Sequence, residues 1–458
     1  MNYNPNDTIA ALATPPGVSA LGVIRISGPE ALEVVDRCFR GRQCPRTMKG
    51  YRAAYGHVMD SSGNPIDEVV IVVYRSPHSY TGEDLVEISG HGSPYVLQKI
   101  LERLLESGAR AAMPGEFTLR AFLNGKLDLA QAEAVADLIE SSNEAQHRTA
   151  LYQMRGHFSK EIAQLRERLI KAAALMELEL DFAEEDVEFV NRSELQHLIK
   201  SIGSWLQRLA ESYQWGRVIK EGVHVLITGR PNVGKSTLLN TLLGDDRAIV
   251  SPIAGTTRDV IEDMRVYKGI IYRFLDTAGL RSTDDAIEQM GISRMLQFAP
   301  KAHWILFIVD LTVENPKRWQ LPQRLRAWKE KVILLGNKID IASRPTISEF
   351  QKRFPQMLMI SASDPTSADK VLALLHHHTV RSQTTDGTPI VNARHYDAII
   401  KAKSALERVS NNLTHQQLPT DLIIPDLREA LDQLSTITGD IVTDDILGHI
   451  FSRFCIGK

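Results

Sequence analysis

A phosphate-binding loop sequence limits the fold of this chain more than any other feature. The string from Gly229 to Ser236 matches the pattern G-x-x-x-x-G-K-[ST] and directly follows the apolar segment Val223–Ile227. Glycines in this pattern let the backbone wrap around phosphates with its N–H groups inward, and the lysine, here Lys235, reaches the outer phosphates. The preceding strand and the apolar helix that follows argue against the alternative, a plain surface turn. The predicted nucleotide contacts of the loop are Asn232, Val233, Gly234, Lys235, Ser236 and Thr237, with the Ser236 hydroxyl also a ligand of Mg²⁺.

Three further strings, in the expected order, predict which nucleotide binds. Each follows an apolar segment that predicts a strand, and the carboxyl ends of parallel strands meet at one edge of a sheet. The carboxylate of Asp340 can accept the two N–H donors of guanine, which adenine does not offer as a pair. Many guanine-nucleotide proteins have lysine where this chain has Ser363, so base recognition is expected to differ slightly there. The predicted contacts are Asp276, Thr277, Ala278 and Gly279, then Asn337, Lys338 and Asp340, then Ser361, Ala362 and Ser363.

The segment Gly255–Asp259 matches the first switch loop of small GTPases, in which Thr257 would complete the coordination of Mg²⁺. In the second switch, Ras-like proteins have a glutamine that orients the attacking water, whereas this chain has Leu280. Another group must therefore activate water, and Asn232 beside the phosphates could coordinate a monovalent cation that neutralises charge. Acidic residues just beyond Leu280 are further candidates for activating the water: Asp284, Asp285 and Glu288. The alternative is that these residues only form a solvated acidic loop.

Changes of pattern along the 458 residues predict a multidomain chain of α/β and all-α parts. Val- and Ile-rich stretches between turns predict an amino-terminal α/β domain over residues 1–117. Long amphipathic patterns, such as Phe117–Ser142, predict helices over 118–220. Strands that alternate with helices predict a parallel sheet of Ras-like fold over 221–380, and helices return over 381–458. We therefore expect a P-loop domain inserted between two halves of one helical domain; four domains in a row are the alternative.

Composition limits the location and the chemistry of the chain. The sequence has no run of about 18 apolar residues, so no membrane span is expected. Met1–Ala13 has no Lys or Arg and no sustained apolar core, which argues against a targeting segment and favours the cytoplasm. The three cysteines, Cys38, Cys44 and Cys455, lack metal-ligand spacing and are expected to be reduced thiols. A net charge of -3 gives no overall attraction to nucleic acid, although a local basic patch is compatible with it.

Several strings outside the nucleotide motifs narrow the interpretation further. They are Thr14–Gly17, Thr81–Asp84, Gly90–Gly92, Pro114–Phe117, Lys126–Glu133 and the ending Phe454–Lys458. Together with Asn232 and the first-switch string, they resemble the MnmE family, formerly called TrmE, of tRNA-modifying GTPases. The resemblance covers the whole length of the chain.

The resemblance implies a modification of tRNA. Family members add an aminomethyl or carboxymethylaminomethyl group to C5 of the wobble uridine (U34), together with an FAD- and NADH-using partner, MnmG, in a heterotetramer or larger complex. The carbon is attributed to a folate, 5-formyl- or methylene-tetrahydrofolate, bound by an amino-terminal domain that forms a homodimer. The positions that match the family's folate contacts are Arg25, Glu87, Lys126 and Lys458. Cationic side chains suit the carboxylates of a folate, and a carboxylate side chain suits its pterin edge. Taken alone, each of these four residues could also be an ordinary surface ion.

The resemblance also implies how GTP is hydrolysed. Two nucleotide domains meet across their switches, K⁺ takes the place of an arginine finger, and Glu288 matches the water-orienting glutamate. Lys235 and Cys455 complete the predicted catalytic residues; Cys455 would add to C6 of the uridine, with a reduced bystander thiol as the alternative. Ser251 stands where a relative has Thr, so its backbone carbonyl is the expected contact. The matching K⁺ ligands are Asn232, Ser251, Ile253 and Thr256, within a nucleotide-contacting segment of Ser251, Pro252, Ile253, Ala254, Gly255, Thr256 and Thr257.

A GTPase that assembles ribosomes, or otherwise binds RNA as a switch, is the alternative reading. Such proteins share the nucleotide motifs. They lack the folate-type amino-terminal segment and the Cys-Ile-Gly-Lys ending, and they usually add a compact basic RNA-binding fold, for which the sequence shows no candidate. Modification of the wobble uridine discriminates between the two readings.

Overall fold

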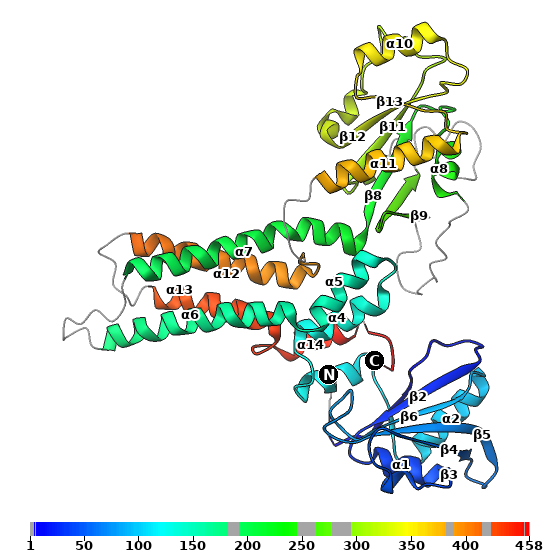
Figure 1. The fold of residues 1–458 in the computed structure, drawn as a ribbon, viewed down its shortest axis with the longest axis vertical. Coiled ribbons are helices and arrows are strands. Elements are labelled where there is room, and N and C mark those ends of the chain that lie inside the picture. The colour runs from blue at the N-terminus through cyan, green and yellow to red at the C-terminus, as the bar shows by residue number, and fades with distance from the viewer. Residues whose placement is uncertain are drawn as a thin grey trace. The chain divides into compact units, whose positions relative to one another are not determined.

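The structure of the chain is a computed structural model that describes residues 4, 6–181, 192–244, 262–276, 295–381, 389–414, 423–452 and 454–457. The chain forms two compact units, and most of their helices and strands are labelled in Figure 1. Unit 1 consists of Met1–Glu140, Ala150–Gly203 and Ala398–Lys458, and unit 2 consists of Ser141–Thr149 and Ser204–Asp397. The bounds of the four predicted segments remain predictions.

Unit 1 contains a seven-stranded sheet of order β3-β4-β5-β6-β2-β1-β7. Its strands pair antiparallel except for the parallel pair β1 and β7. The side chains of β2 alternate: Ile24 and Ile26 enter the core beneath the helices, and Arg25 points to the opposite face. Helices α1 (Ala31–Cys38) and α2 (Pro94–Glu106) supply the rest of this core. The strands are β1 Ile9–Leu12, β2 Leu21–Ser27, β3 Phe39–Gly41, β4 Arg52–Met59, β5 Pro65–Tyr74, β6 Leu85–His91 and β7 Arg110–Ala111.

A second group of helices in unit 1 follows this sheet in the sequence. The predicted stretch Phe117–Ser142 is divided into α3 (Glu116–Leu123) and α4 (Leu129–Glu140). Gly125 has a left-handed φ of 66°, and Asp128 and Gln131 cap each other's backbone N–H groups, as in a capping box. The amphipathic pattern continues across this break, which is why it predicts no interruption. The further helices are α6 His157–Asp181, α13 Ile424–Thr438 and α14 Asp444–Phe451, while α5 Glu144–Met154, α7 Arg192–Glu221 and α12 Ala393–Thr414 contribute to both units.

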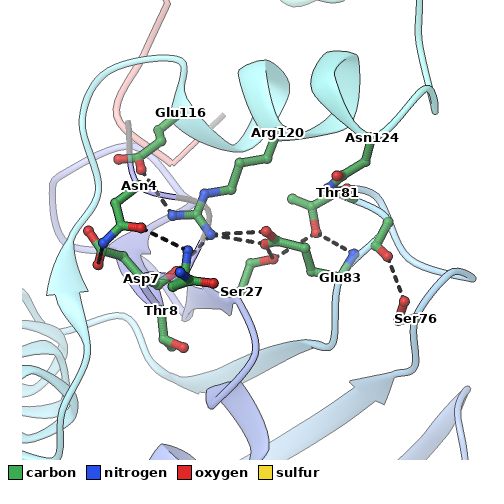
Figure 2. A network of polar contacts seen from close by, with 12 residues as sticks. Asn4, Asp7, Thr8, Ser27, Ser76, Thr81, Glu83, Glu116, Arg120 and Asn124 are labelled. Carbon is green, nitrogen blue, oxygen red and sulfur yellow. Dashed lines mark hydrogen bonds and ion pairs between the residues drawn. The ribbon is translucent and has the colours of Figure 1, made fainter. Parts of the chain in front are cut away.

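A buried ionic network fixes α3 against the amino-terminal sheet (Figure 2). The guanidinium of Arg120 is fully buried and donates to both carboxylate oxygens of Glu83, at 3.1 Å each, and to Glu116 Oε1 at 3.1 Å. It also donates to the backbone carbonyl of Asp7 at 2.8 Å, and Ser27 donates its hydroxyl to Glu83 at 2.8 Å. The strings Thr81–Asp84 and Pro114–Phe117 therefore meet at one arginine.

The carboxylate of Glu116 stays ionised within this network. Burial raises its pKa, but hydrogen bonds from Arg110 and the Met113 backbone N–H, together with the positive charge of Arg110, outweigh burial and hold the pKa below its usual value. The nearest oxygen of Glu116 lies 2.7 Å from Arg110. The network is therefore one of paired charges, which a buried site requires.

Unit 2 contains a six-stranded sheet of order β13-β12-β11-β8-β10-β9 with apolar cores on both faces. Helices α8 (Lys235–Leu243) and α11 (Pro365–Arg381) cover one face. Helix α10 (Arg344–Arg353) and the 3₁₀ segment η3 (Gln323–Lys331) contribute to the other. The strands are β8 Val223–Gly229, β9 Glu262–Tyr267, β10 Ile270–Asp276, β11 Trp304–Asp310, β12 Val332–Asn337 and β13 Leu358–Met359.

Five strands of the unit 2 sheet are parallel, as predicted, and the sixth, β9, forms an antiparallel edge. Strand β9 runs antiparallel to β10, and the two are joined by Lys268 and Gly269. Both linking residues have positive φ, 48° and 79°, as a two-residue hairpin of type I′ requires. The hairpin turn at Lys268 and Gly269 is a local sequence signal. The alternation of strands and helices in the rest of the unit does not predict it.

We expect unit 2 to lose stability in mild acid because of His303. Burial, then the positive charges of His224, Arg217 and Lys331, lower the pKa of His303 to about 4. Its Nδ1 accepts the backbone N–H of His224 at 3.1 Å. Because the unfolded chain binds a proton near pH 6.5 and the folded chain only near pH 4, the free energy of unfolding should fall by about 2–3 kcal/mol as the pH drops through this window.

The measurement is urea unfolding followed by tryptophan fluorescence between pH 7 and 4. All five tryptophans lie between residues 204 and 397, so the signal reports unit 2. His303→Gln should flatten the pH dependence, whereas the exposed His377→Gln should leave it unchanged. Equal slopes for His303→Gln and the unmodified chain would contradict the assignment.

Candidate functional site

The predicted nucleotide strings gather at one edge of the sheet in unit 2. Strands β8, β10, β11, β12 and β13 are parallel, so their carboxyl ends lie along the same edge. The backbone of Asp276 ends β10 at this edge. An open parallel sheet binds ligands in the crevice outside these strand ends.

The loop after β8 has the backbone that wraps around phosphates. Gly234 stands at the N-cap of α8 with φ 94°, and a Cβ there would lie 2.5 Å from the Asn337 side-chain nitrogen. Asn232 also has positive φ, 60°, and is exposed. The Lys235 ammonium donates to the carbonyls of Gly229, at 3.2 Å, and Arg230, at 2.9 Å. The lysine therefore lies at the mouth of the loop, and only glycine fits at 234.

Asn337 joins the phosphate loop to the loop that follows β13. Its side chain is buried; it donates to the Val233 carbonyl at 2.7 Å and accepts the Ala362 N–H at 2.8 Å. The hydroxyls of Ser361 and Ser363 lie 3.2 Å apart in the same loop. Three of the four predicted strings thus converge through one amide.

The base-recognition string continues from Asn337 with Lys338 in left-handed conformation, φ 68°. The Lys338 ammonium pairs with Asp310 at 2.6 Å, and Asp340 beyond it is exposed. Burial raises the pKa of Asp310, but hydrogen bonds from Lys338 and Thr312 outweigh it and hold the pKa below its usual value. The lysine is therefore held by an ionised carboxylate.

Sequence reasoning missed two supporting residues, Asp310 and Thr241. Asp310 ends the apolar strand β11, as Asp276 ends β10, and that position was the available signal. Thr241 lies in the last turn of α8, and its hydroxyl donates to the Ala362 carbonyl at 2.7 Å. Nothing in the helical pattern marks Thr241, because the contact spans 121 positions of the chain.

We expect Thr241→Val to weaken guanine-nucleotide binding by about 2- to 10-fold, because one hydrogen bond that supports the Ser361–Ser363 loop is lost at nearly constant shape. Thr241→Ser retains the hydroxyl and should bind nucleotide like the unmodified chain. Fluorescent-nucleotide titration measures both. Equal weakening in the two variants would point to packing rather than to the hydroxyl.

A second set of predicted residues meets on the face of the unit 1 sheet opposite to α1 and α2. Arg25 and Glu87 are direct cross-strand neighbours, and their side chains form an ion pair of 2.7 Å. The Arg25 guanidinium lies 5.3 Å from the ring centre of Tyr80 and 5.8 Å from that of Phe117. Tyr74 donates its hydroxyl to the second oxygen of Glu87 at 3.3 Å. This arrangement offers a paired cation and carboxylate beside aromatic rings.

The carboxyl-terminal tail reaches this pair. Arg25 donates to the Gly457 carbonyl at 3.3 Å. Gly457 has φ 97°, and a Cβ there would lie 2.3 Å from the Leu12 carbonyl oxygen, so a larger residue would displace the tail. Cys455 is exposed. Lys126 donates instead to the Pro77 carbonyl at 3.0 Å.

Several predicted residues lie outside the described residues: Lys458, the switch segments that contain Ser251–Thr257 and Thr277–Gly279, and Leu280, Asp284, Asp285 and Glu288. The side chain of Asp276 is not described either. No helix in the described ranges is long and apolar enough to cross a membrane.

Two family models match the chain. The family model described as "GTP-binding protein TrmE N-terminus" matches residues 8–126, and that described as "MnmE helical domain" matches residues 129–455. Among solved structures, Era in complex with MgGDPNP and a 16S ribosomal RNA segment is 29% identical, with coverage of 40% of this chain and 66% of that chain and a TM-score of 0.25.

Curated relatives match along the whole chain. The protein of Cytophaga hutchinsonii is 46% identical over 99% of this chain and 98% of its own, and that of Parabacteroides distasonis is 45% identical over 98% and 100%. The Flavobacterium psychrophilum protein is 45% identical over 99% of both chains. All three carry the name tRNA modification GTPase MnmE. With both family models and these full-length matches, the chain belongs to the MnmE family.

Proposed function

We propose that this protein binds and hydrolyses GTP at the carboxyl edge of the unit 2 sheet and acts in the modification of tRNA. The convergence of the phosphate loop and the two base-side loops on Asn337 is the observation that carries the proposal. Family membership supports the reaction, since full-length relatives are named tRNA modification GTPase.

The residues of the chain would divide the work of hydrolysis. Backbone N–H groups of the phosphate loop and the Lys235 ammonium would bind the β- and γ-phosphates, and Asp340 would select guanine. The Ser236 hydroxyl, in the first turn of α8, is a hard oxygen donor that suits Mg²⁺, with Thr257 as the proposed second ligand. That ion would neutralise phosphate charge. Glu288 would orient the attacking water, since Leu280 cannot.

We infer further that K⁺ supports catalysis. The exposed Asn232 offers an amide oxygen within the phosphate loop, which fits a monovalent cation, and Ser251, Ile253 and Thr256 are the other proposed ligands. A cation there would offset the charge that develops on the transferred phosphate.

GTP turnover is therefore expected to be about 10-fold or more faster in K⁺ than in Na⁺. The reason is that the ion would replace an arginine finger, which in other GTPases accelerates hydrolysis by several powers of ten. Steady-state phosphate release in matched chloride salts measures this. Asn232→Ala should remove the difference between the two salts. Equal rates in the two salts would contradict the role of K⁺.

The Arg25 and Glu87 pair is the proposed folate site. The Glu87 carboxylate can accept hydrogen bonds from a flat pterin ring, which the neighbouring aromatic rings also suit. The Arg25 cation can bind a carboxylate of the folate. Lys126 and Lys458 are further proposed contacts. The bound tetrahydrofolate, 5-formyl or methylene, would supply one carbon. Cys455, on the tail that Arg25 contacts, is the proposed nucleophile toward the uridine.

The proposed reaction places a carboxymethylaminomethyl or aminomethyl group at C5 of U34, with an FAD-dependent MnmG-type partner. A homodimer and a cytoplasmic location complete the proposal. A titration with 5-formyltetrahydrofolate should show binding to the unmodified chain and loss of binding in Glu87→Gln, while GTP turnover stays unchanged. Equal affinity of both proteins would exclude the Arg25 and Glu87 site.

The decisive experiment compares wobble-uridine nucleosides in bulk tRNA from cells with and without this protein. Loss of the C5-modified nucleosides, restored by the unmodified gene, is the expected result. Intact modification would remove the tRNA role and leave the alternative, an RNA-binding or ribosome-assembly switch. The full-length relatives favour the first reading.

A further inference from the structure

A basic segment at one edge of the unit 1 sheet has no part in the functions proposed above. It comprises the end of α1, the edge strand β3, the 3₁₀ turn η1 (Pro45–Thr47) and the start of β4. Although the whole chain has a net charge of -3, no Asp or Glu occurs between Asp36 and Asp60. The cations of this stretch are Arg37, Arg40, Arg42, Arg46, Lys49 and Arg52.

Most of this charge is not neutralised locally. Arg46 pairs with Glu33 at 2.8 Å, and Arg37 lies 4.0 Å from Glu30. The other four cations are exposed, and within the described parts of the chain no carboxylate lies at ion-pair distance from them. These four are Arg40, Arg42, Lys49 and Arg52. A local excess of cations on a chain of negative net charge is the electrostatic signature of a polyanion site.

Exposed aromatic side chains accompany these cations. Tyr51 is 67% exposed and Tyr55 is 59% exposed, both large values for aromatic residues. Tyr51 also has a left-handed φ of 61°, which is uncommon for a bulky residue and costs energy. An aromatic ring held in solvent by a strained backbone, next to cations, suits the stacking of a nucleic-acid base.

The same tyrosine connects the basic segment to the Arg25 and Glu87 pair. Its ring contacts Tyr74 edge to face, with centres 5.8 Å apart and planes at 84°. The Tyr74 hydroxyl donates to Glu87, which pairs with Arg25. Tyr51 therefore lies two contacts away from Glu87 of the proposed folate site, and a base stacked on Tyr51 would lie three contacts away.

We propose that residues 37–55, named here the basic edge, bind an unpaired loop of the tRNA substrate, with phosphates on the cations and one base on Tyr51. Unpaired RNA exposes base faces for stacking, and its phosphates require cations without competing carboxylates. An acidic protein surface would need the cations but not the exposed rings, so RNA is the better match. The inference rests on the proposed role in tRNA modification.

The first test is a binding titration of the full chain with labelled bulk tRNA at several salt concentrations. Arg42→Glu combined with Lys49→Glu should weaken binding by about 10-fold or more and lower the salt slope by about 1–2, because each lost phosphate contact removes about 0.7–0.9 from the slope. Lys99→Glu is the matched control: it reverses an exposed cation of the same unit, on α2, and should change affinity less than about 2-fold. GTP turnover should be unchanged in all variants.

The second test separates stacking from charge at Tyr51. Tyr51→Gly suits the left-handed backbone, so it should fold, yet it should bind tRNA roughly 5- to 10-fold more weakly with an unaltered salt slope. Tyr51→Phe retains the ring and should bind like the unmodified chain.

Three outcomes would overturn the inference. The first is unchanged tRNA affinity in the variant with Arg42→Glu and Lys49→Glu. The second is a loss of tRNA affinity in that variant no larger than the loss in Lys99→Glu. The third is intact tRNA binding with loss of the flavoprotein partner, which would assign the basic edge to protein docking. Failure of the proposed function is distinguishable, because wobble modification would then persist in cells that lack the protein.

Discussion

Asp340→Asn should weaken GTP binding by roughly 100-fold or more and create a preference for xanthosine triphosphate. The carboxylate accepts two N–H donors of guanine, and each hydrogen bond to a charged group contributes about 1.5–3 kcal/mol. An amide can accept only one of them, but it can donate to the additional carbonyl of xanthine. Competition titrations with the two nucleotides measure the switch.

The exposed Asp369→Asn, on α11 of the same unit, is the matched control and should leave the base preference unchanged. Since Asp340 is itself exposed and Lys338 is held independently by Asp310, the substitution should not disturb folding. A variant that loses both nucleotides equally would indicate a structural role for Asp340 and exclude the assignment to base selection.

Arg120→Met should destabilise unit 1 by about 3–5 kcal/mol. The substitution leaves the carboxylates of Glu83 and Glu116 without the buried guanidinium to which both are hydrogen-bonded, and an uncompensated buried charge costs about this much. Amide hydrogen exchange of β1 and β2 measures the effect, because the network spans the segments beside these strands.

Arg428→Met provides the comparison for a surface pair. Arg428 is 65% exposed and pairs with Glu177 at 2.6 Å, so its loss should cost less than about 1 kcal/mol. Should Arg120→Met cost no more than Arg428→Met, the buried network would contribute packing but no net electrostatic stabilisation.

The nucleotide edge was predictable because its signals are local. Each string follows its own apolar strand, and parallel strands bring those ends together whatever the rest of the chain does. The predicted strand Val223–Ile227 lies within β8, and the apolar segment before Asn337 forms β12. Asp310 and Thr241 escaped prediction because their roles depend on which loop lies opposite, not on their own neighbours in sequence.

The division of the helices shows a different limit. Amphipathic periodicity correctly predicted a helical region after Phe117, but it continues through the turn between α3 and α4. The break depends on the conformation of Gly125 and on the reciprocal cap between Asp128 and Gln131. Both signals are local: the Asn124-Gly125 dipeptide is typical of a turn, and Asp128 and Gln131 have the spacing of a reciprocal cap.

The sequence by itself determined the class of fold, the nucleotide-binding strings and the family, because each depends on short runs of residues with a fixed local geometry. Only the tertiary structure decided which distant residues meet. Arg25 contacts Glu87 across 62 positions and Gly457 across 432, and Arg120 contacts Glu83 across 37. Such contacts depend on the register of the strands and on the course of the chain through the fold, which no local sequence pattern encodes. They determine the position of the carboxyl-terminal tail, the buried ionic network and the contacts that link Tyr51 to Glu87.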